Sequence, residues 1–396
     1  MPWYPRIQAA INATLTELLP TQATNLALFV SALLAKRTLC LSALARAYPS
    51  CAAGQRRVAQ PKHDLLHRLK RLWRFLDNER VDPLAVQTAL IRVTVRQLGR
   101  PRWLGLALDW TEFDTTVPTG QRRRYQVLRI AVPRRGRALP LLQVAYDRDA
   151  LPAGHSQNQL EEAALLAVLQ ALPAGVRPVV LADRGFARAS FLAWLQEQGV
   201  DYVIRRTRRT RRTCLTAADG RRVKLGTDDG LPDGLPPGQM QWWPQMRYGL
   251  HHDRPRDLWI HAALCWRLPK HQVRQRRAKP PDEPWYLATS LPGGARPAVA
   301  WYQQRWWIEE SFKDVHSRFG LKHVQIGCPQ RLTRLLAAVT VALCWLTLLA
   351  LPHVRALPDG WHSAVAAWGR PSLTSLALEY LDAFHDLPAT CLPSGP

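Results

Sequence analysis

Two aspartates directly follow short apolar runs that have the character of buried strands. Asp109 comes after residues 104–108, and Asp183 comes after residues 179–182. A single aspartate at the end of a strand is most often a turn residue or a helix cap. If the two strands are neighbours, however, both carboxylates lie at one edge of the sheet and can share a divalent cation. The pair therefore predicts metal-dependent chemistry, such as phosphodiester cleavage by two ions about 4 Å apart.

A third acid lies in a helical segment at residues 298–319 that is rich in basic and aromatic residues. At about 100° per residue along this helix, five side chains share one narrow face: Tyr302, Arg305, Glu309, Lys313 and His316. Glu310 falls about 100° away from Glu309, so Glu309 is the acid of this doublet that aligns with the basic groups. The alternative is an exposed helix with a Glu309–Lys313 ion pair. A carboxylate flanked by phosphate-binding cations and a flat ring favours nucleic acid.

The charge of the whole chain indicates the same partner. Lys and Arg number 54 and Asp and Glu number 30, which gives a net charge of +24. Most of the excess is arginine, which binds phosphate bidentately and releases condensed counterions from nucleic acid. Six arginines crowd residues 205–212, and we expect Arg208 and Arg209 in particular to follow a DNA backbone. A solvated loop is the alternative for this segment.

Composition limits the remaining classes. The chain has 396 residues, of which 47% are hydrophobic and 21% charged, so we expect a folded protein of more than one domain. Seven scattered cysteines and a start without a secretory layout favour a reduced, cytoplasmic protein. Residues 335–351 are almost entirely apolar, and we expect a buried core helix rather than a membrane span. No Gly-x4-Gly-Lys-[Ser/Thr] motif is present, so no nucleotide cofactor is predicted.

The order of elements predicts the fold. Apolar patterns indicate three short strands, then a helix, a strand, a helix and a fifth strand, at residues 104–108, 126–132, 139–146, 157–172, 179–182, 187–198 and 200–204. This order matches the ribonuclease-H-like α/β fold, a mixed sheet with flanking helices in which the first and fourth strands lie side by side. Such a sheet brings Asp109 and Asp183 together.

The chain divides into five predicted parts. A helical DNA-binding domain at 1–100 includes a basic helix at 65–81, for which a solvated basic face is an equal alternative. The catalytic core is interrupted, and the remaining parts are the first core segment at 101–204, a β-rich insertion at 205–290, the second core segment at 291–352 and a helical tail at 353–396. We expect His251, His252 and His261 in the insertion to lie in a solvated loop rather than at a metal.

The three acid motifs together resemble those of the DDE transposases of bacterial insertion sequences. Leu108-Asp109-Trp110-Thr111 and Ala182-Asp183-Arg184-Gly185-Phe186 are similar to the family's first and second acid motifs. Tyr302, Arg305 and Glu309 match the branch with the signature Tyr-x2-Arg-x3-Glu-x6-Lys, and the β-rich insertion is also similar. The final signature position is His316 instead of lysine, which weakens a phosphate contact or transfers it to Lys313.

The resemblance implies cut-and-paste transposition. Asp109, Asp183 and Glu309 would hold two Mg2+ ions, for which Mn2+ substitutes, and the partners would be double-stranded inverted-repeat ends and target DNA, bound by a homodimer. The branch is associated with a hairpin intermediate in which a flipped base stacks on aromatic rings, and Trp242, Trp243 and Trp259 are weak candidates for that stack. The expected location is the bacterial cytoplasm, on the nucleoid.

Three other interpretations remain open. The first is an inactive transposase relative that binds DNA without cutting it, which His316 in place of lysine makes conceivable. The second is another nuclease of the same fold that acts on RNA or branched DNA. The last is a membrane protein, which rests on the single apolar stretch.

Overall fold

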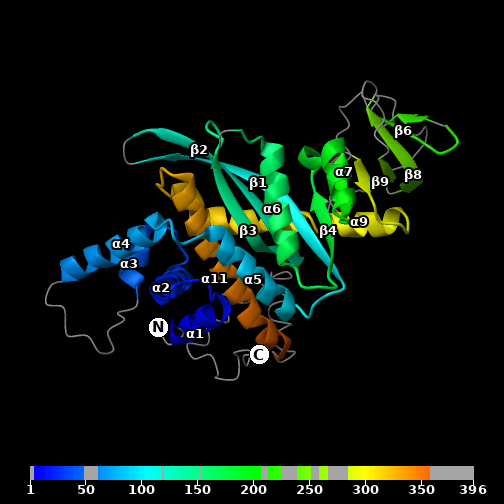
Figure 1. Ribbon diagram of the computed structural model, residues 1–396. Coiled ribbons are helices and arrows are strands. Elements are labelled where there is room, and N and C mark those ends of the chain that lie inside the picture. The colour runs from blue at the N-terminus through cyan, green and yellow to red at the C-terminus, as the bar shows by residue number, and fades with distance from the viewer. Residues whose placement is uncertain are drawn as a thin grey trace, which may run out of the picture. The chain divides into compact units, whose positions relative to one another are not determined.

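In the computed structural model the chain divides into two compact units, whose elements are labelled in Figure 1. The structure describes residues 4–48, 61–117, 120–134, 136–151, 154–206, 213–220, 222–224, 239–250, 258–265 and 284–356. Unit 1 comprises Met1–Pro101, Asp109–Val176 and Trp307–Pro396, and unit 2 comprises Arg102–Leu108 and Arg177–Trp306. The boundary thus falls inside a strand, directly before Asp109.

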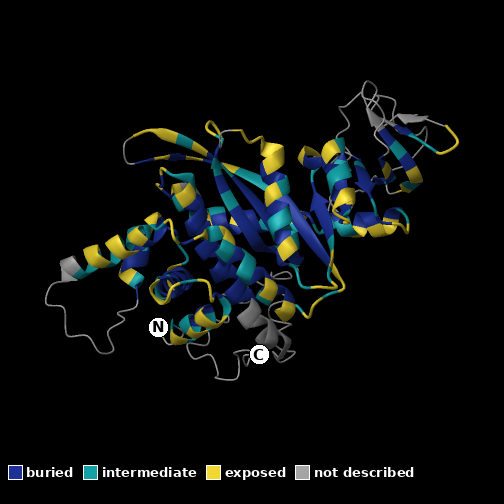
Figure 2. Cartoon of the chain, in the orientation of Figure 1, coloured by how far each residue is buried: buried dark blue, intermediate teal, exposed yellow. Residues whose placement is uncertain are grey.

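The N-terminal part of unit 1 is helical, as predicted. Its helices are α1 (Tyr4–Thr14), α2 (Pro20–Lys36), α3 (Leu41–Ala47), α4 (Pro61–Asp77) and α5 (Pro83–Gln97). The start of α5 follows from its sequence, because the Asp82 side chain accepts a hydrogen bond from the Leu84 amide at 2.8 Å and Pro83 occupies the first helical position. In α4, Leu72 and Leu76 are buried while Lys70, Arg71 and Arg74 are exposed, so the predicted amphipathic basic helix is confirmed (Figure 2).

The long helix α11 (Pro329–Ala356) completes the core of unit 1. It packs against α2, α4, α5 and the strand β3 (Arg137–Asp147). Residues 335–346 are buried in a hydrophobic cluster that also contains residues of α1 to α4, so the predicted buried core helix is confirmed. Within the part of the chain that the structure describes, no single helix meets the length and hydropathy expected of a membrane span; the bent pair of α2 and α3 meets them only in combination.

The strand β1 (Trp103–Thr116) contributes its first residues to unit 2 and its later residues to unit 1. In unit 1 the order is β3, β2 (Arg122–Arg134) and β1. The helix α6 (Gln157–Ala171) contacts β3 and β2. In unit 2 the order is β1-β4-β5-β10-β9-β8-β6-β7. Those strands are β4 (Arg177–Ala182), β5 (Asp201–Arg206), β6 (Thr213–Thr216), β7 (Arg222–Lys224), β8 (Met240–Leu250), β9 (Trp259–Cys265) and β10 (Trp285–Thr289).

Strand directions confirm the predicted ribonuclease-H-like fold. β1 pairs in parallel with β4, which pairs in parallel with β5, while β2 and β3 are antiparallel. The first and fourth predicted strands are therefore neighbours. β4 and β5 are buried along most of their length and appear dark blue in Figure 2, as expected for strands covered on both faces. In unit 2, helices α7 (Ala189–Glu197) and α9 (Ala295–Gln303) accompany them.

One predicted element is wrong in its continuity. The single helix expected at 298–319 is divided into α9, a turn at Gln304 and Arg305, and α10 (Trp306–Lys313), which continues as a π-helical turn at Asp314–Arg318. A helical wheel assumes one unbroken axis, so the shared face of the five predicted residues does not hold across this break.

The predicted parts of the chain are distributed over the two units. Residues 205–290 are β-rich where the structure describes them, with β6 to β10. The helices of 1–100 share one core with α11 and with residues of β2 and β3, and unit 1 contains residues from four of the predicted parts. The tail beyond Ala356 lies outside the described residues.

Candidate active site

The first two acids follow directly from paired strand residues. In unit 2, the register of β1 and β4 pairs Leu108 with Ala182. The next residues along the chain are Asp109 and Asp183. Both strands are parallel, so their carboxyl ends meet at one edge of the sheet. The strand pairing that the sequence predicted is thus present up to the residue before each acid.

Asp183 stands at a tight turn of unit 2. Its Oδ1 accepts a hydrogen bond from the Gly185 amide at 2.8 Å and caps a short 3-10 helix at Arg184–Phe186. The side chain is half-buried. A β-carbon added at Gly185 would lie 3.1 Å from that Oδ1, so glycine leaves the room that the carboxylate occupies. A carboxylate can accept about four hydrogen bonds, so the bond from the Gly185 amide leaves Asp183 able to accept further contacts.

In unit 1, Asp109 lies on the same face of β1 as three residues that contact the segment after α10. Side chains alternate along a strand, so Asp109, Thr111, Phe113 and Thr115 share one face. Thr111 Oγ1 lies 3.2 Å from His316 Nε2, and the Phe113 ring meets the His316 ring edge-on at 6.0 Å. Thr115 Oγ1 donates to the Val324 carbonyl. Asp109 therefore faces the side of the strand on which the segment after α10 lies.

The helix α10, which carries Glu309, is fastened to β2 by a buried arginine. Arg129 Nη1 donates to Ser311 Oγ at 3.1 Å, and its guanidinium lies 3.9 Å from the centre of the Phe312 ring. Burial lowers the pKa of Arg129 to about 9, while the negative charges of Asp109 and Asp314 oppose this shift. Arg129 remains cationic at neutral pH. It contacts the helix that carries Glu309, and its charge acts on Asp109.

Glu310 and Lys313 belong to the outer side of α10. Lys313 is 63% exposed and forms an ion pair with Glu310, which also lies 3.7 Å from Arg137 Nη1. Arg137 Nε donates to Asp314 Oδ2 at 2.6 Å. Glu309 is half-buried. Glu310 is half-buried as well, and it carries ion pairs with Lys313 and Arg137.

In unit 2, Tyr302 and Arg305 are buried, with 4% and 8% of their surface exposed. The Tyr302 ring belongs to the core cluster of unit 2, meets Trp285 edge-on at 5.0 Å and lies 5.7 Å from the Arg305 guanidinium. Burial raises the pKa of the Tyr302 hydroxyl, against the opposing charges of Arg305 and Arg205. Tyr302 therefore supports Arg305 from within the core and does not present its ring for stacking.

Two residues of this region escaped the sequence reasoning. Trp306, directly after Arg305, is 53% exposed and is the aromatic side chain of the segment that faces solvent most. The helical-wheel argument did not select Trp306, because that argument assumed one continuous helix. Arg129 was missed although it carries a signal, since it is a lone arginine inside the apolar run of β2. A single cation in the centre of an otherwise apolar strand predicts a buried charge whose donors are hydrogen-bonded.

Other sequence candidates are placed unevenly. Arg208, Arg209, His251 and His252 lie outside the described residues. His261 lies on β9 and not in the expected loop. Its ring stacks on the Trp242 ring at 5.2 Å, and its Nδ1 accepts a hydrogen bond from the Gln245 amide. Trp243 is buried at 8% exposure, whereas Trp259 is 40% exposed. Of the three tryptophans, Trp259 is therefore the most accessible.

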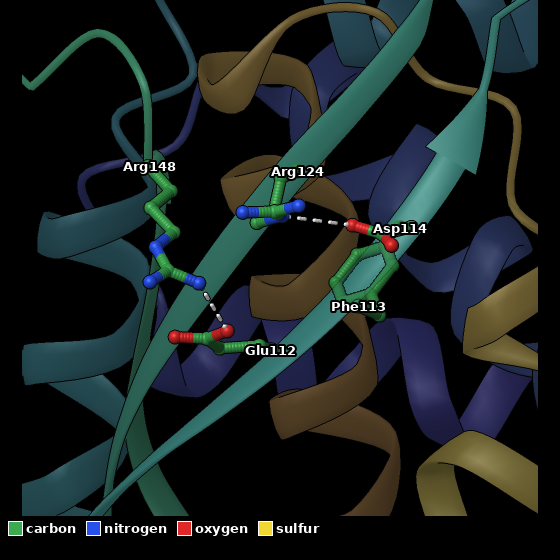
Figure 3. Close-up of a pocket in the computed structure, with 5 residues that line it drawn as sticks. All are labelled: Glu112, Phe113, Asp114, Arg124 and Arg148. Atoms are coloured by element: carbon green, nitrogen blue, oxygen red, sulfur yellow. Dashed lines mark hydrogen bonds and ion pairs between the residues drawn. The ribbon is translucent and has the colours of Figure 1, made fainter.

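The neighbouring acids of β1 are already neutralised by arginines. A shallow pocket of about 480 Å³ is lined by Glu112, Phe113, Asp114, Arg124 and Arg148 (Figure 3). Glu112 pairs with Arg148 at 2.8 Å, and Asp114 pairs with Arg122 and with Arg124. The Arg122 hydrogen bond holds the pKa of Asp114 below its usual range. These carboxylates lie on the opposite face of the strand from Asp109 and are engaged in ion pairs.

The three predicted acids fit a hard divalent ion by the chemistry of their donors. Each supplies carboxylate oxygens, which Mg2+ prefers, and Asp109 and Asp183 follow neighbouring parallel strands. Among the residues that the structure describes, no three His, Cys, Asp or Glu side chains lie close enough together to form a complete metal site.

The fold and the two strand-end aspartates define a candidate metal-dependent enzyme on a ribonuclease-H-like core. A family model described as "Transposase DDE domain" matches residues 104–345, more than half of the chain. The protein therefore belongs to the transposase DDE domain family, which implies a transposase-type enzyme that binds DNA, and enzymes of this family use divalent metals. A search of curated proteins finds no match to the chain.

Proposed function

We propose that this protein is the transposase of a bacterial insertion sequence, which cuts DNA at its inverted-repeat ends and joins them to target DNA. The observation that carries the proposal is the pairing of Leu108 with Ala182, because it sets two aspartates after adjacent parallel strands in a chain of the transposase DDE domain family. The Tyr302, Arg305 and Glu309 spacing supports the branch with the Tyr-Arg-Glu-Lys signature.

Asp109, Asp183 and Glu309 are the proposed ligands of two Mg2+ ions, with Mn2+ as a substitute. Such ions, when bound, supply activation of a water or 3′-hydroxyl and stabilisation of the leaving oxygen. Each acid has its own support in the chain. The Gly185 amide orients Asp183, the β1 backbone holds Asp109, and the contacts of Ser311 and Phe312 with Arg129 hold the helix of Glu309.

The basic residues bind the DNA backbone in this proposal. Lys313, Arg208 and Arg209 contact phosphates, the exposed Lys70, Arg71 and Arg74 of α4 supply further cations in unit 1, and Arg305 acts from the interior of unit 2. Tyr302 acts from the core by supporting Arg305. If a hairpin forms, Trp306 and Trp259 are exposed enough to stack on a flipped base, whereas Trp243 is buried.

His316 takes a supporting part. Its ring contacts Thr111 and Phe113 of β1, two and four residues after Asp109. These contacts give the residue a role in holding β1 against the turn after α10, and they favour Lys313, with its exposed ammonium group, as the phosphate ligand of this helix. We expect two copies of the chain to act together, because two transposon ends must be cut in one complex.

The test is to incubate the purified protein and Mg2+ with DNA that carries its gene and several hundred flanking bases, beside Asp109→Ala. Cuts at paired inverted repeats that disappear in Asp109→Ala, with DNA affinity kept, are the expected result. Binding without cuts by either protein would contradict the proposal and favour an inactive DNA-binding relative. Cuts that do not depend on terminal repeats would favour a different nuclease of this fold.

A further inference from the structure

Arg129 on β2 is a fully buried cation, with 0% of its surface exposed. Its Nε and Nη2 donate to Gln143 Oε1 at 2.9 and 2.7 Å, and its Nη1 donates to Ser311 Oγ at 3.1 Å. The remaining face of the guanidinium lies over the Phe312 ring. A buried charge is costly unless it is satisfied in this way. The groups that satisfy it come from two sides, β3 on one and α10 on the other.

The partners of Arg129 are all neutral. Within the described part of unit 1, no carboxylate forms an ion pair with its guanidinium, and the negative groups that act on it electrostatically are Asp109 and Asp314. A neutral side chain of similar volume would avoid the desolvation cost of the cation. Core packing alone therefore does not account for a charge at this position, which acts on both Asp109 and Asp314.

Gln143 anchors Arg129 to the core of unit 1. Its Nε2 donates to Thr340 Oγ1 at 2.8 Å on α11, and its backbone amide donates to Gln87 Oε1 at 2.8 Å on α5. Thr340 Oγ1 in turn donates to Gln87 Oε1 at 3.1 Å. These four buried side chains form one hydrogen-bonded network, so the guanidinium has a fixed position rather than a range of rotamers.

We propose that Arg129 is a positioning residue of the active site: through Ser311 and Phe312 it fixes α10, and with it Glu309, against β2, the strand next to that of Asp109. Glu309 is two residues before Ser311 and three before Phe312, so both contacts of Arg129 lie within one helical turn of the acid. The inference rests on the proposed function, in which Asp109 and Glu309 act as a pair.

Three variants separate positioning from core packing. Arg129→Met keeps an unbranched apolar stem and removes the charge and the donors, Arg129→Lys keeps the charge, and Ser311→Ala removes only the bond to α10. Thr333→Val is the matched control, because Thr333 is a buried α11 residue whose Oγ1 accepts from the Ala145 amide and does not contact Arg129. If Arg129→Met does not fold, Arg129→Lys and Ser311→Ala carry the test.

The measurements are the kcat and KM for cleavage of end DNA, the affinity for that DNA, and amide hydrogen exchange of α10 and α11. We expect Arg129→Met to lower kcat about 100-fold with KM and DNA affinity within about twofold, since it displaces groups without removing a DNA contact. Arg129→Lys should recover part of kcat, and Ser311→Ala should lower kcat about fivefold. Exchange should accelerate at residues 306–313 and stay slow in α11.

Equal kcat for Thr333→Val and Arg129→Met, or unchanged exchange in α10, would overturn the assignment. If the wild-type protein cuts end DNA and Arg129→Met cuts it equally well, Arg129 is not a positioning residue although the proposed function stands. If the wild-type protein cuts nothing, the proposed function fails, and hydrogen exchange still reports whether Arg129 fixes α10.

Discussion

The two units hold their acids by different means. In unit 2, Asp183 ends an apolar strand, and one hydrogen bond from a neighbour two residues away sets its carboxylate. In unit 1, the helix of Glu309 is held by Arg129, whose partners Gln143 and Ser311 are 14 and 182 residues away along the chain. The Asp109 carboxylate also accepts a local hydrogen bond, from the Trp110 amide at 2.9 Å. The two aspartates are thus set by neighbours in the sequence, whereas Glu309 lies on a helix held by buried contacts between distant segments.

This difference predicts different responses to substitution. A change near Asp183 should alter cleavage with little effect on folding, because few long-range contacts are involved. A change in unit 1 should affect stability, because its helices, α11 and strands β2 and β3 share one core. The predictions below test that contrast.

The largest effect on stability is expected at Arg334 on α11. Its Nε and Nη1 donate to the carbonyls of Val81 and Leu76 at 3.1 and 2.9 Å, so it caps the end of α4 from within the core. Arg334→Ala leaves both carbonyls buried without this donor, and we expect the free energy of unfolding to fall by about 3 kcal/mol. Urea unfolding followed by circular dichroism measures it.

Arg331, one turn earlier on the same helix, is the matched control. It is 40% exposed and pairs with the exposed Asp77. Arg331→Ala should cost less than about 1 kcal/mol, as surface ion pairs do. Equal losses for the two variants would show that α4 and α11 do not share a core, and would remove the basis for treating the N-terminal helices as part of unit 1.

A smaller effect is expected at Gly185 in unit 2. The methyl group of Gly185→Ala would meet Asp183 Oδ1 at 3.1 Å and shift the carboxylate by a few tenths of an ångström. Cleavage of end DNA should fall about tenfold, since misplacement of a reacting group by about 1 Å costs up to about 100-fold. The free energy of unfolding should change by less than about 0.5 kcal/mol. A large loss of stability with normal cleavage would reverse the contrast between the units.

The smallest effect concerns pH and the core of unit 1. Burial raises the pKa of the Cys344 thiol to about 12, and Sγ donates to the Pro140 carbonyl at 3.2 Å. The folded protein keeps a proton that the unfolded chain releases above the ordinary thiol pKa of 9.0, so stability falls as pH rises through this range. The slope from this one group is at most about 1.4 kcal/mol per pH unit.

Cys344→Ala removes that contribution. Urea unfolding of both proteins at a series of pH values above 9 should show a shallower decline for the variant, whatever its stability at neutral pH. Parallel curves would mean that the thiol is not shielded in the folded state, and that the core of unit 1 around α11 admits water.

The contrast between the units also explains how far the sequence could be interpreted. Apolar runs before Asp109 and Asp183 predicted the two strands, because burial on both faces leaves a continuous apolar pattern, and the order of elements predicted that β1 and β4 are neighbours. Periodicity could not show the turn at Gln304 and Arg305, where the Arg305 side chain enters the interior of unit 2. It could not show the network of Arg129 either, since its members have no regular spacing.

The most direct test of the three-acid site compares Glu309→Gln with Glu310→Gln. The two side chains are adjacent, and each substitution removes one negative charge while keeping the size of the side chain. We predict that Glu309→Gln lowers Mg2+-dependent cleavage of end DNA at least about 1,000-fold with DNA affinity kept. Glu310→Gln, which loses only its ion pairs with Lys313 and Arg137, should cut within about threefold of wild type. Normal cleavage by Glu309→Gln, or an equal loss in Glu310→Gln, would contradict the account.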